Sequence, residues 1–129
     1  MYTTWELRGK LQKEGFPKEV VEEALAFLSE RGYLNDRLYA STYIEEKRQV
    51  APRGYFAFYH ELKSRGIPSE LLSELRDMYP LEAEVEDAKG LLLRWGVKEK
   101  EKLWQRLLRR GFSHEAIERA ILDLRNSGD

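Results

Sequence analysis

The chain of 129 residues is long enough for one domain or for a short array of smaller modules, and its formal net charge of −1 at pH 7 excludes a polycation. Apolar residues make up 42% of it, which is enough for a packed core and argues against disorder. There is no cysteine, so disulfides and thiol chemistry are excluded. No apolar run approaches the roughly 20 residues of a membrane span, and no signal peptide is visible. We therefore expect a cytoplasmic protein that makes no membrane contact.

One pattern of residues occurs three times at matching offsets. In each copy a leucine stands four residues before a glycine, and a large apolar residue follows that glycine. Pro or Ser, then Glu, then two adjacent apolar residues come next. The copies cover residues 11–21, 62–72 and 107–117.

Each copy predicts a helix, a tight turn and a second helix. Glycine adopts a positive φ without steric cost where a helix ends, and Pro or Ser suits the start of the next helix. We infer an internal repeat. We expect the apolar residues after the three glycines to fill the turn junctions, namely Phe16, Ile67 and Phe112.

In chain order, the spacing of apolar residues predicts about eight helices and no strand. The expected helices cover approximately residues 5–14, 17–31, 36–49, 55–62, 68–78, 81–95, 98–110 and 113–125. The segment 50–54, which contains Pro52 and Gly54, interrupts the pattern and marks a module boundary. The expected fold is all-α and elongated, with three tandem three-helix repeats of which the last is incomplete. The repeats are residues 1–50, 51–96 and, with two helices only, 97–129.

Residue patterns for catalysis or metal binding are lacking. His60 and His114 fall in different modules, and neither has the spacing of a metal site. No phosphate-binding glycine loop or nucleophile motif occurs. We interpret four carboxylates near the start of the 81–95 helix as solvated rather than as an acid/base site, namely Glu82, Glu84, Glu86 and Asp87. The prediction is a non-enzyme with no catalytic residue, cofactor, metal or small-molecule substrate.

Basic residues line one side of the 98–110 helix. At a period of 3.6 residues this side carries Lys98, Lys102, Arg106 and Arg109, roughly opposite the leucines, and Arg110 flanks it. Two interpretations stay open: a solubilising face, or a strip that contacts phosphates or an acidic protein surface. A looser basic cluster surrounds the first module boundary and the end of the 55–62 helix: Lys47, Arg48, Arg53, Lys63 and Arg65.

The 55–62 helix carries four aromatic residues that cannot all face inward, because they span most of its circumference. We expect Phe56 to be exposed or to cover a neighbouring module. Packing between modules and a stacking or partner-binding role are the alternatives for this residue.

The segment 32–40, GYLNDRLYA, resembles the signature of the RecX family, bacterial regulators of the RecA recombinase. The family pattern is Gly-Tyr-aliphatic-Asp/Asn-Asp, two variable positions and Tyr-Ala, followed by an aromatic residue. Arg53-Gly54, Glu61-Leu62 and Gly66-Ile67 resemble the second repeat, and residues 109–113 with Ile117 resemble the third. The resemblance covers about residues 11–124. The signature positions to which it assigns structural roles are Gly32, Tyr33, Asp36, Tyr39, Ala40, Tyr43, Gly66 and Gly111, with the three tyrosines as packing residues and Asn35/Asp36 as a helix cap.

This resemblance implies a non-enzymatic protein that lies in the helical groove of the RecA filament on single-stranded DNA. There it would limit strand exchange, ATP turnover and filament extension. An elongated stack of modules can span neighbouring RecA protomers, so that each module adds contacts. The residues expected to face the filament or its DNA are Arg48, Arg53, Lys63, Arg65, Lys98, Lys102, Arg106, Arg109 and Arg110.

Relatives are often more basic, so the near-neutral charge favours a contact dominated by protein, with at most weak direct DNA binding, made by a monomer. Two alternatives belong to other classes. One is a direct DNA-binding module built on the helix-turn-helix-like pair 103–110 and 113–125, and the other is a helical scaffold for another protein.

Overall fold

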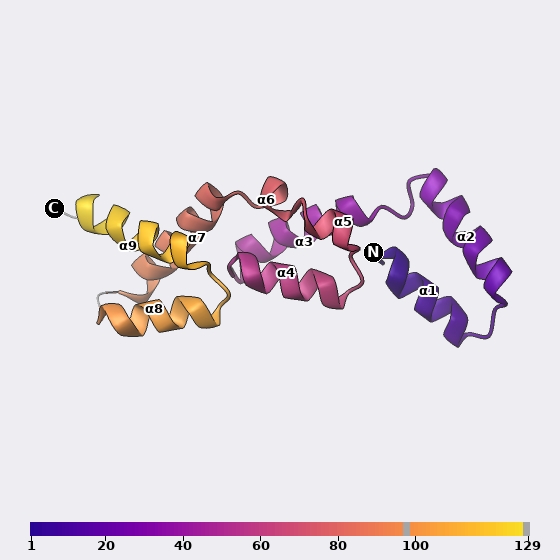
Figure 1. The fold of residues 1–129 in the computed structure, drawn as a ribbon, viewed down its shortest axis with the longest axis horizontal. Helices are drawn as coiled ribbons and strands as arrows, with labels where there is room; N and C mark the ends of the chain where they lie inside the picture. Colours follow the sequence, from indigo (N-terminus) through magenta and orange to yellow (C-terminus); the bar gives the residue numbers. More distant parts are fainter. Residues whose placement is uncertain (97–98, 128–129) are drawn as a thin grey trace.

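The computed structural model describes residues 1–96 and 99–127, and these residues form nine α-helices and no strand. The helices are α1 (Thr4–Lys13), α2 (Lys18–Glu30), α3 (Asp36–Val50), α4 (Tyr55–Ser64), α5 (Ser69–Leu72), α6 (Leu75–Met78), α7 (Leu81–Trp95), α8 (Lys100–Arg109) and α9 (His114–Ser127). They form an elongated rod with α1 and α2 at one end and α8 and α9 at the other (Figure 1). The expected all-α, elongated fold is confirmed.

The three repeat turns follow the expected backbone geometry. Gly15, Gly66 and Gly111 have φ angles of 94°, 87° and 87°. Each lies between two helices that the apolar spacing predicted. The recurring sequence pattern therefore corresponds to a recurring helix–turn–helix unit.

The helix expected over residues 68–78 is divided into α5 and α6. At the division, the amide of Glu74 donates to the carbonyl of Leu71 at 3.0 Å, three residues back instead of four. This tighter turn allows Leu72 and Leu75 to be buried in the same core. The division accounts for nine helices where about eight were expected.

The buried residues form three separate cores, one for each of three units. The N-terminal unit (α1 and α2) has a small core of Val21, Leu25 and Leu34. The middle unit (α3 to α6) and the C-terminal unit (α7 to α9) have much larger cores. The middle core includes Tyr39, Ala40, Ile44, Phe58, Leu62 and Tyr79, and the C-terminal core includes Val85, Ala88, Leu107, Phe112, Ile117 and Ala120.

The cores group the helices differently from the expected modules, whose boundaries fell after residues 50 and 96. Helix α3 shares a core with α4, and α7 shares one with α8 and α9. The packing therefore favours boundaries near residues 35 and 80. Periodicity shows which side of a helix faces inward, but it does not show which neighbouring helix that side contacts.

Successive units meet at two junctions of the same kind. A Cβ at Gly66 would lie 2.2 Å from the Cβ of Trp5, and one at Gly111 would lie 2.5 Å from the Cβ of Ala57. The start of α1 thus lies on the second repeat turn, and the start of α4 lies on the third. As a result α1, α4 and α8 follow one another along the lower side of the rod in Figure 1.

The first repeat turn has no such neighbour. A Cβ at Gly15 would meet nothing within 4 Å. Ile67 and Phe112 are buried as expected, whereas Phe16 is 49% exposed. The expectation that Phe16 fills a junction is wrong, because no helix start among the described residues covers its turn.

Replacing the turn glycines with alanine tests the junction. Gly66→Ala and Gly15→Ala both place a side chain at positive φ, which costs about 1–2 kcal/mol. Only Gly66→Ala also collides with Trp5. We expect the midpoint of urea unfolding to fall further for Gly66→Ala than for the matched Gly15→Ala control, and equal losses would contradict the close contact.

Candidate functional site

A buried carboxylate holds the second junction, between the middle and C-terminal units. Glu84 in α7 is fully buried. It accepts hydrogen bonds from the amides of Tyr55 at 3.0 Å and Ser113 at 2.8 Å, and from the Ser113 hydroxyl at 2.9 Å. Arg76 forms an ion pair with it at 2.9 Å. Tyr55 begins α4 and Ser113 precedes α9, so one carboxylate serves the starts of two helices, where amides lack intrahelical acceptors.

The interpretation of the acidic segment as a solvated helix start is wrong for two of its four residues. Glu84 is buried, and Asp87 binds Arg48 at 2.7 Å and accepts the Tyr79 hydroxyl at 2.8 Å. Burial, and then the neighbouring Asp87, raise the pKa of Tyr79. The sequence holds one signal that α4 needs an acceptor from elsewhere in the chain. The helix begins after Gly54, which has no side chain to cap it.

At the first junction, between the N-terminal and middle units, a carboxylate again accepts an amide at the start of another helix. Asp36, the first residue of α3, accepts the amide of Thr4 at 2.8 Å, and the Thr3 hydroxyl donates to the carbonyl of Arg65 at 2.6 Å. At the second junction the corresponding donor is the amide of Gly54, which bonds the carbonyl of Arg110 at 2.9 Å. Asp36 therefore joins two units, while Asn35 caps α3.

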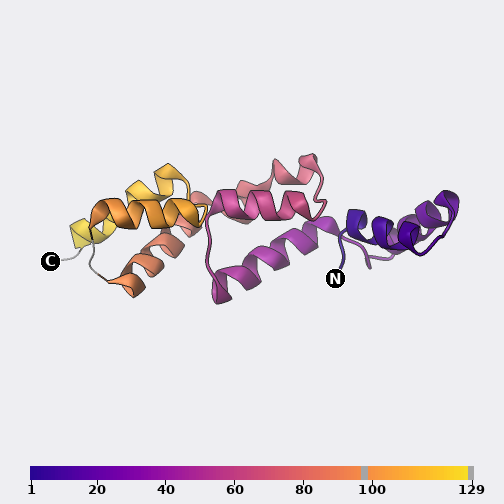
Figure 2. The same cartoon turned by 90° about the horizontal axis from the view of Figure 1, so that it is seen from below.

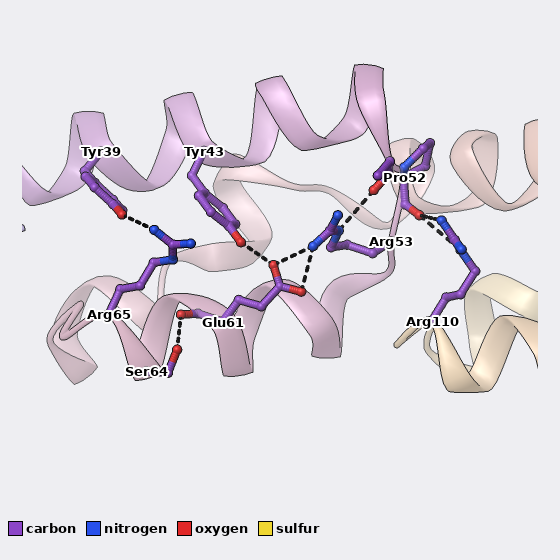
Figure 3. A network of polar contacts seen from close by, with 9 residues as sticks. Tyr39, Tyr43, Pro52, Arg53, Glu61, Ser64, Arg65 and Arg110 are labelled. Carbon is purple, nitrogen blue, oxygen red and sulfur yellow. Dashed lines mark hydrogen bonds and ion pairs between the residues drawn. The ribbon is translucent and has the colours of Figure 1, made fainter. Parts of the chain in front are cut away.

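A row of polar contacts runs between α3 and α4 (Figure 3). Arg65 donates to the Tyr39 hydroxyl at 2.7 Å, and the Tyr43 hydroxyl donates to Glu61. Glu61 also binds Arg53 at 2.9 Å. Burial and the hydrogen bond to Glu61 raise the pKa of Tyr43. The row fixes two basic residues, Arg65 and Arg53, at opposite ends of α4.

The other signature tyrosine lies elsewhere. Tyr33 is 74% exposed, in contrast to the expected packing role. In the link between α2 and α3 the neighbouring Leu34 is buried instead. Of the remaining signature residues Tyr39 and Ala40 are buried, and Gly32 ends α2 with a φ of 78°.

Basic side chains gather where α8 meets α4. A groove of about 290 Å³ is lined by Arg53, Arg109 and Arg110 together with Glu61. A second groove of about 470 Å³ is lined by Lys102, Arg106 and Arg109. Arg109 lines both grooves, so they adjoin the same side chain. We call these five cations, Arg53, Lys102, Arg106, Arg109 and Arg110, the basic side.

Besides Arg53, two members of the basic side are held in place by the protein. Arg110 donates to the carbonyl of Pro52 at 2.7 Å, and the guanidinium of Arg106 lies 3.8 Å from the centre of the Trp95 ring. Burial, followed by the charges of Arg53, Arg106 and Arg94, lowers the pKa of Arg110. The three neighbouring cations therefore disfavour the charge of Arg110, and a bound anion would offset this repulsion. Arg94 contributes to this repulsion, and its place on the 81–95 helix did not predict that role.

The other basic candidates are not brought to this surface. Arg48 is occupied by Asp87 and lies over the Tyr79 ring, inside the second junction. Arg65 lies at the far end of α4, over the Tyr43 ring. Lys63 is exposed in the last turn of α4 and lines neither groove. Lys98 lies outside the described residues.

Phe56, in the first turn of α4, is exposed as expected. Its amide donates to the carbonyl of Gly111 at 2.9 Å, so its backbone takes part in the second junction. Among residues 1–96 and 99–127, no group of three or more His, Asp or Glu side chains could hold a metal ion. No helix in this described part is long and apolar enough to cross a bilayer.

Comparison with known proteins gives consistent matches. Family models described as the first and the third three-helix domain of RecX match residues 1–28 and 83–121. The regulatory protein RecX of Caldanaerobacter subterraneus subsp. tengcongensis is 35% identical, and the match covers 94% of this chain and 62% of that relative. The regulatory protein RecX of Pasteurella multocida is 33% identical over 88% of this chain and 74% of that relative. This chain thus spans less than two thirds of the first relative.

A solved structure agrees in fold. The crystal structure of RecX from Lactobacillus salivarius superposes with a TM-score of 0.86 at 23% sequence identity. The match covers 96% of this chain and 86% of that one.

Removing the charge of Glu84 tests the second junction. Glu84→Gln leaves Arg76 without its ionic partner and turns an amide group toward donors, so we expect a loss of about 3 kcal/mol in the free energy of unfolding. Glu82→Gln, an exposed carboxylate in the same first turn, is the matched control. It should change the free energy by no more than about 0.5 kcal/mol. Similar values for the two variants in urea unfolding would show that the junction does not depend on this carboxylate.

Proposed function

This chain belongs to the RecX family, and from that premise we propose that it regulates the RecA recombinase. In this proposal the protein lies in the helical groove of the RecA filament on single-stranded DNA and inhibits it. Strand exchange, ATP turnover and filament extension would all be limited. The family membership supports a regulatory role, and the inhibitory mode is our proposal for this chain.

The observation that carries the proposal is the basic side. Its five cations come from two different units, and the second junction fixes one unit against the other. Side chains already held by Pro52 and Trp95 lose little freedom when they bind. An extended array of positive charges, three of them held by the protein, suits a partner with regularly spaced negative charge, such as a protein filament on DNA.

The remaining surface restricts how the protein would bind. The net charge of −1 means that carboxylates elsewhere balance these cations. Binding would therefore be oriented, with the basic side toward the filament. We expect protein contacts to dominate and the protein to act as a monomer on each binding site.

The proposal includes no reaction. Among the described residues Glu84 is the fully buried carboxylate, and its oxygens already bind three donors and Arg76. Its contacts join two units, and neither oxygen is left for a substrate proton. A regulatory role without catalysis is the function that these contacts support.

Direct DNA binding is the second candidate, and the basic side is the observation that favours it. In a helix-turn-helix the second helix reads the major groove. Here that helix is α9, which carries Glu115, Glu118 and Asp123 against Arg119 and Arg125. This acidic balance disfavours insertion into a duplex groove.

Charge reversal on the basic side tests whether these cations are needed for inhibition. In an assay of RecA's DNA-dependent ATPase and strand exchange, we expect the unaltered protein to inhibit at substoichiometric ratios. Arg106→Glu/Arg109→Glu should raise the half-inhibitory concentration at least tenfold, because two cations of the basic side become anions. Arg119→Glu on α9, which lines neither groove, is the matched control and should inhibit normally.

Two results would contradict the proposal. One is unchanged ATPase and strand exchange at every ratio of the unaltered protein to RecA. The other is tight, salt-dependent and sequence-preferring binding to naked duplex that RecA does not affect, which would support the second candidate instead.

A further inference from the structure

Helix α2 at one end of the rod exposes an apolar stripe. Val20 and Phe27 are two turns apart on one side of the helix, and Phe27 is 51% exposed. The small N-terminal core takes Val21 and Leu25 from α2, with Leu28 packed against it, and it includes neither Val20 nor Phe27. Arg31 lies over one face of the Phe27 ring, 4.2 Å from its centre.

Carboxylates surround this stripe. Helix α2 carries four glutamates, Glu19, Glu22, Glu23 and Glu30, and one lysine, Lys18. Glu22 is paired with Arg8 at 2.9 Å. Glu23 lies between the two apolar residues, three residues from Val20 and four from Phe27, and neither Glu23 nor Glu30 has an ion pair within the described part of the chain. We call Val20, Glu23, Phe27 and Glu30 the acidic stripe.

At the opposite end the C-terminal unit has an apolar cavity of about 580 Å³. It lies between the end of α7, the start of α8 and the second half of α9, with Leu92, Leu103, Ile121 and Leu124 among its lining residues. Lys100 and Arg125 also line it, and neither has an ionic partner in the described residues. Leu93 beside them is 70% exposed. We call this feature the end cavity.

We propose that the acidic stripe of one copy of this chain docks in the end cavity of a second copy. Val20 and Phe27 would enter the cavity, whose volume lies in the range of about 300–1,000 Å³ typical of binding pockets. Glu23 and Glu30 would lie against Lys100 and Arg125. Apolar surface and opposite charge therefore match at the same place.

The shape of the rod makes this contact intermolecular. Helix α2 and helix α9 lie at opposite ends (Figure 2), so a single copy cannot fill its own end cavity. The two surfaces differ, and each copy keeps one of each kind free. Association is therefore head-to-tail and can continue beyond two copies. This inference goes beyond regulation of RecA and does not depend on it.

Two single substitutions test the contact. Phe27→Glu destroys the acidic stripe and leaves the end cavity intact, whereas Leu93→Glu places a carboxylate at the end cavity and leaves the stripe intact. Both residues are exposed, so folding should be retained, as circular dichroism would show. In sedimentation velocity over a concentration series, the unaltered protein should exceed the monomer mass as concentration rises, and each variant alone should stay monomeric.

An equimolar mixture of the two variants gives the sharpest outcome. One variant contributes a stripe and the other a cavity, so the mixture should form a heterodimer that does not grow further. Tyr33→Glu, another exposed aromatic residue outside both surfaces, should associate like the unaltered protein. Monomer at every concentration, dimer formation by Leu93→Glu alone, or no heterodimer in the mixture would each overturn the proposal.

Charge exchange provides an independent measurement. Lys100→Glu/Arg125→Glu should weaken self-association at least tenfold. Adding Glu23→Lys/Glu30→Lys to a second copy should restore association between the two variants in a mixture. Absence of any restoration would exclude the assigned ionic contacts.

Discussion

The structure depends on how the first amides of its helices find acceptors. An α-helix leaves its first amides without intrahelical partners, and at both junctions of this rod a carboxylate from another helix accepts them. Asp36 accepts from the start of α1, and Glu84 accepts from the starts of α4 and α9. Each carboxylate belongs to the first helix of the following unit. Consecutive units are therefore joined by the same kind of contact at both boundaries.

The second of these contacts also creates the candidate interface. By holding the start of α4 beside the turn between α8 and α9, it brings Arg53 from one unit beside Arg109 and Arg110 of the next. The hydrogen bond from Arg110 to Pro52 crosses the same boundary. A surface formed in this way is as rigid as the junction beneath it. This explains how a protein with almost no net charge can present a concentrated positive surface.

Much of the fold follows from local sequence. The apolar spacing predicted nearly every helix, and the repeated glycine predicted the three turns, because both signals act within a few residues. Contacts between distant segments were not predictable in this way. Periodicity did not show that α3 packs on α4, and nothing local distinguished buried Glu84 from exposed Glu82. For the site, helical spacing predicted the basic stripe on α8. That Arg53 lies beside this stripe, and that Arg48 instead pairs with Asp87, could be seen only in the three-dimensional structure.

The small core of the N-terminal unit has a consequence for how the molecule opens. In a linear array each unit is stabilised by its own core and by its contacts with neighbouring units. The free-energy cost of local unfolding is therefore lowest for a unit with a small core and few such contacts. Val21, Leu25 and Leu34 form the smallest of the three cores, and a single junction attaches α1 to the rest. The α1–α2 hairpin should therefore fray while the middle and C-terminal units stay folded. Loss of order at that end leaves Arg53, just before α4, in register with the arginines of α8.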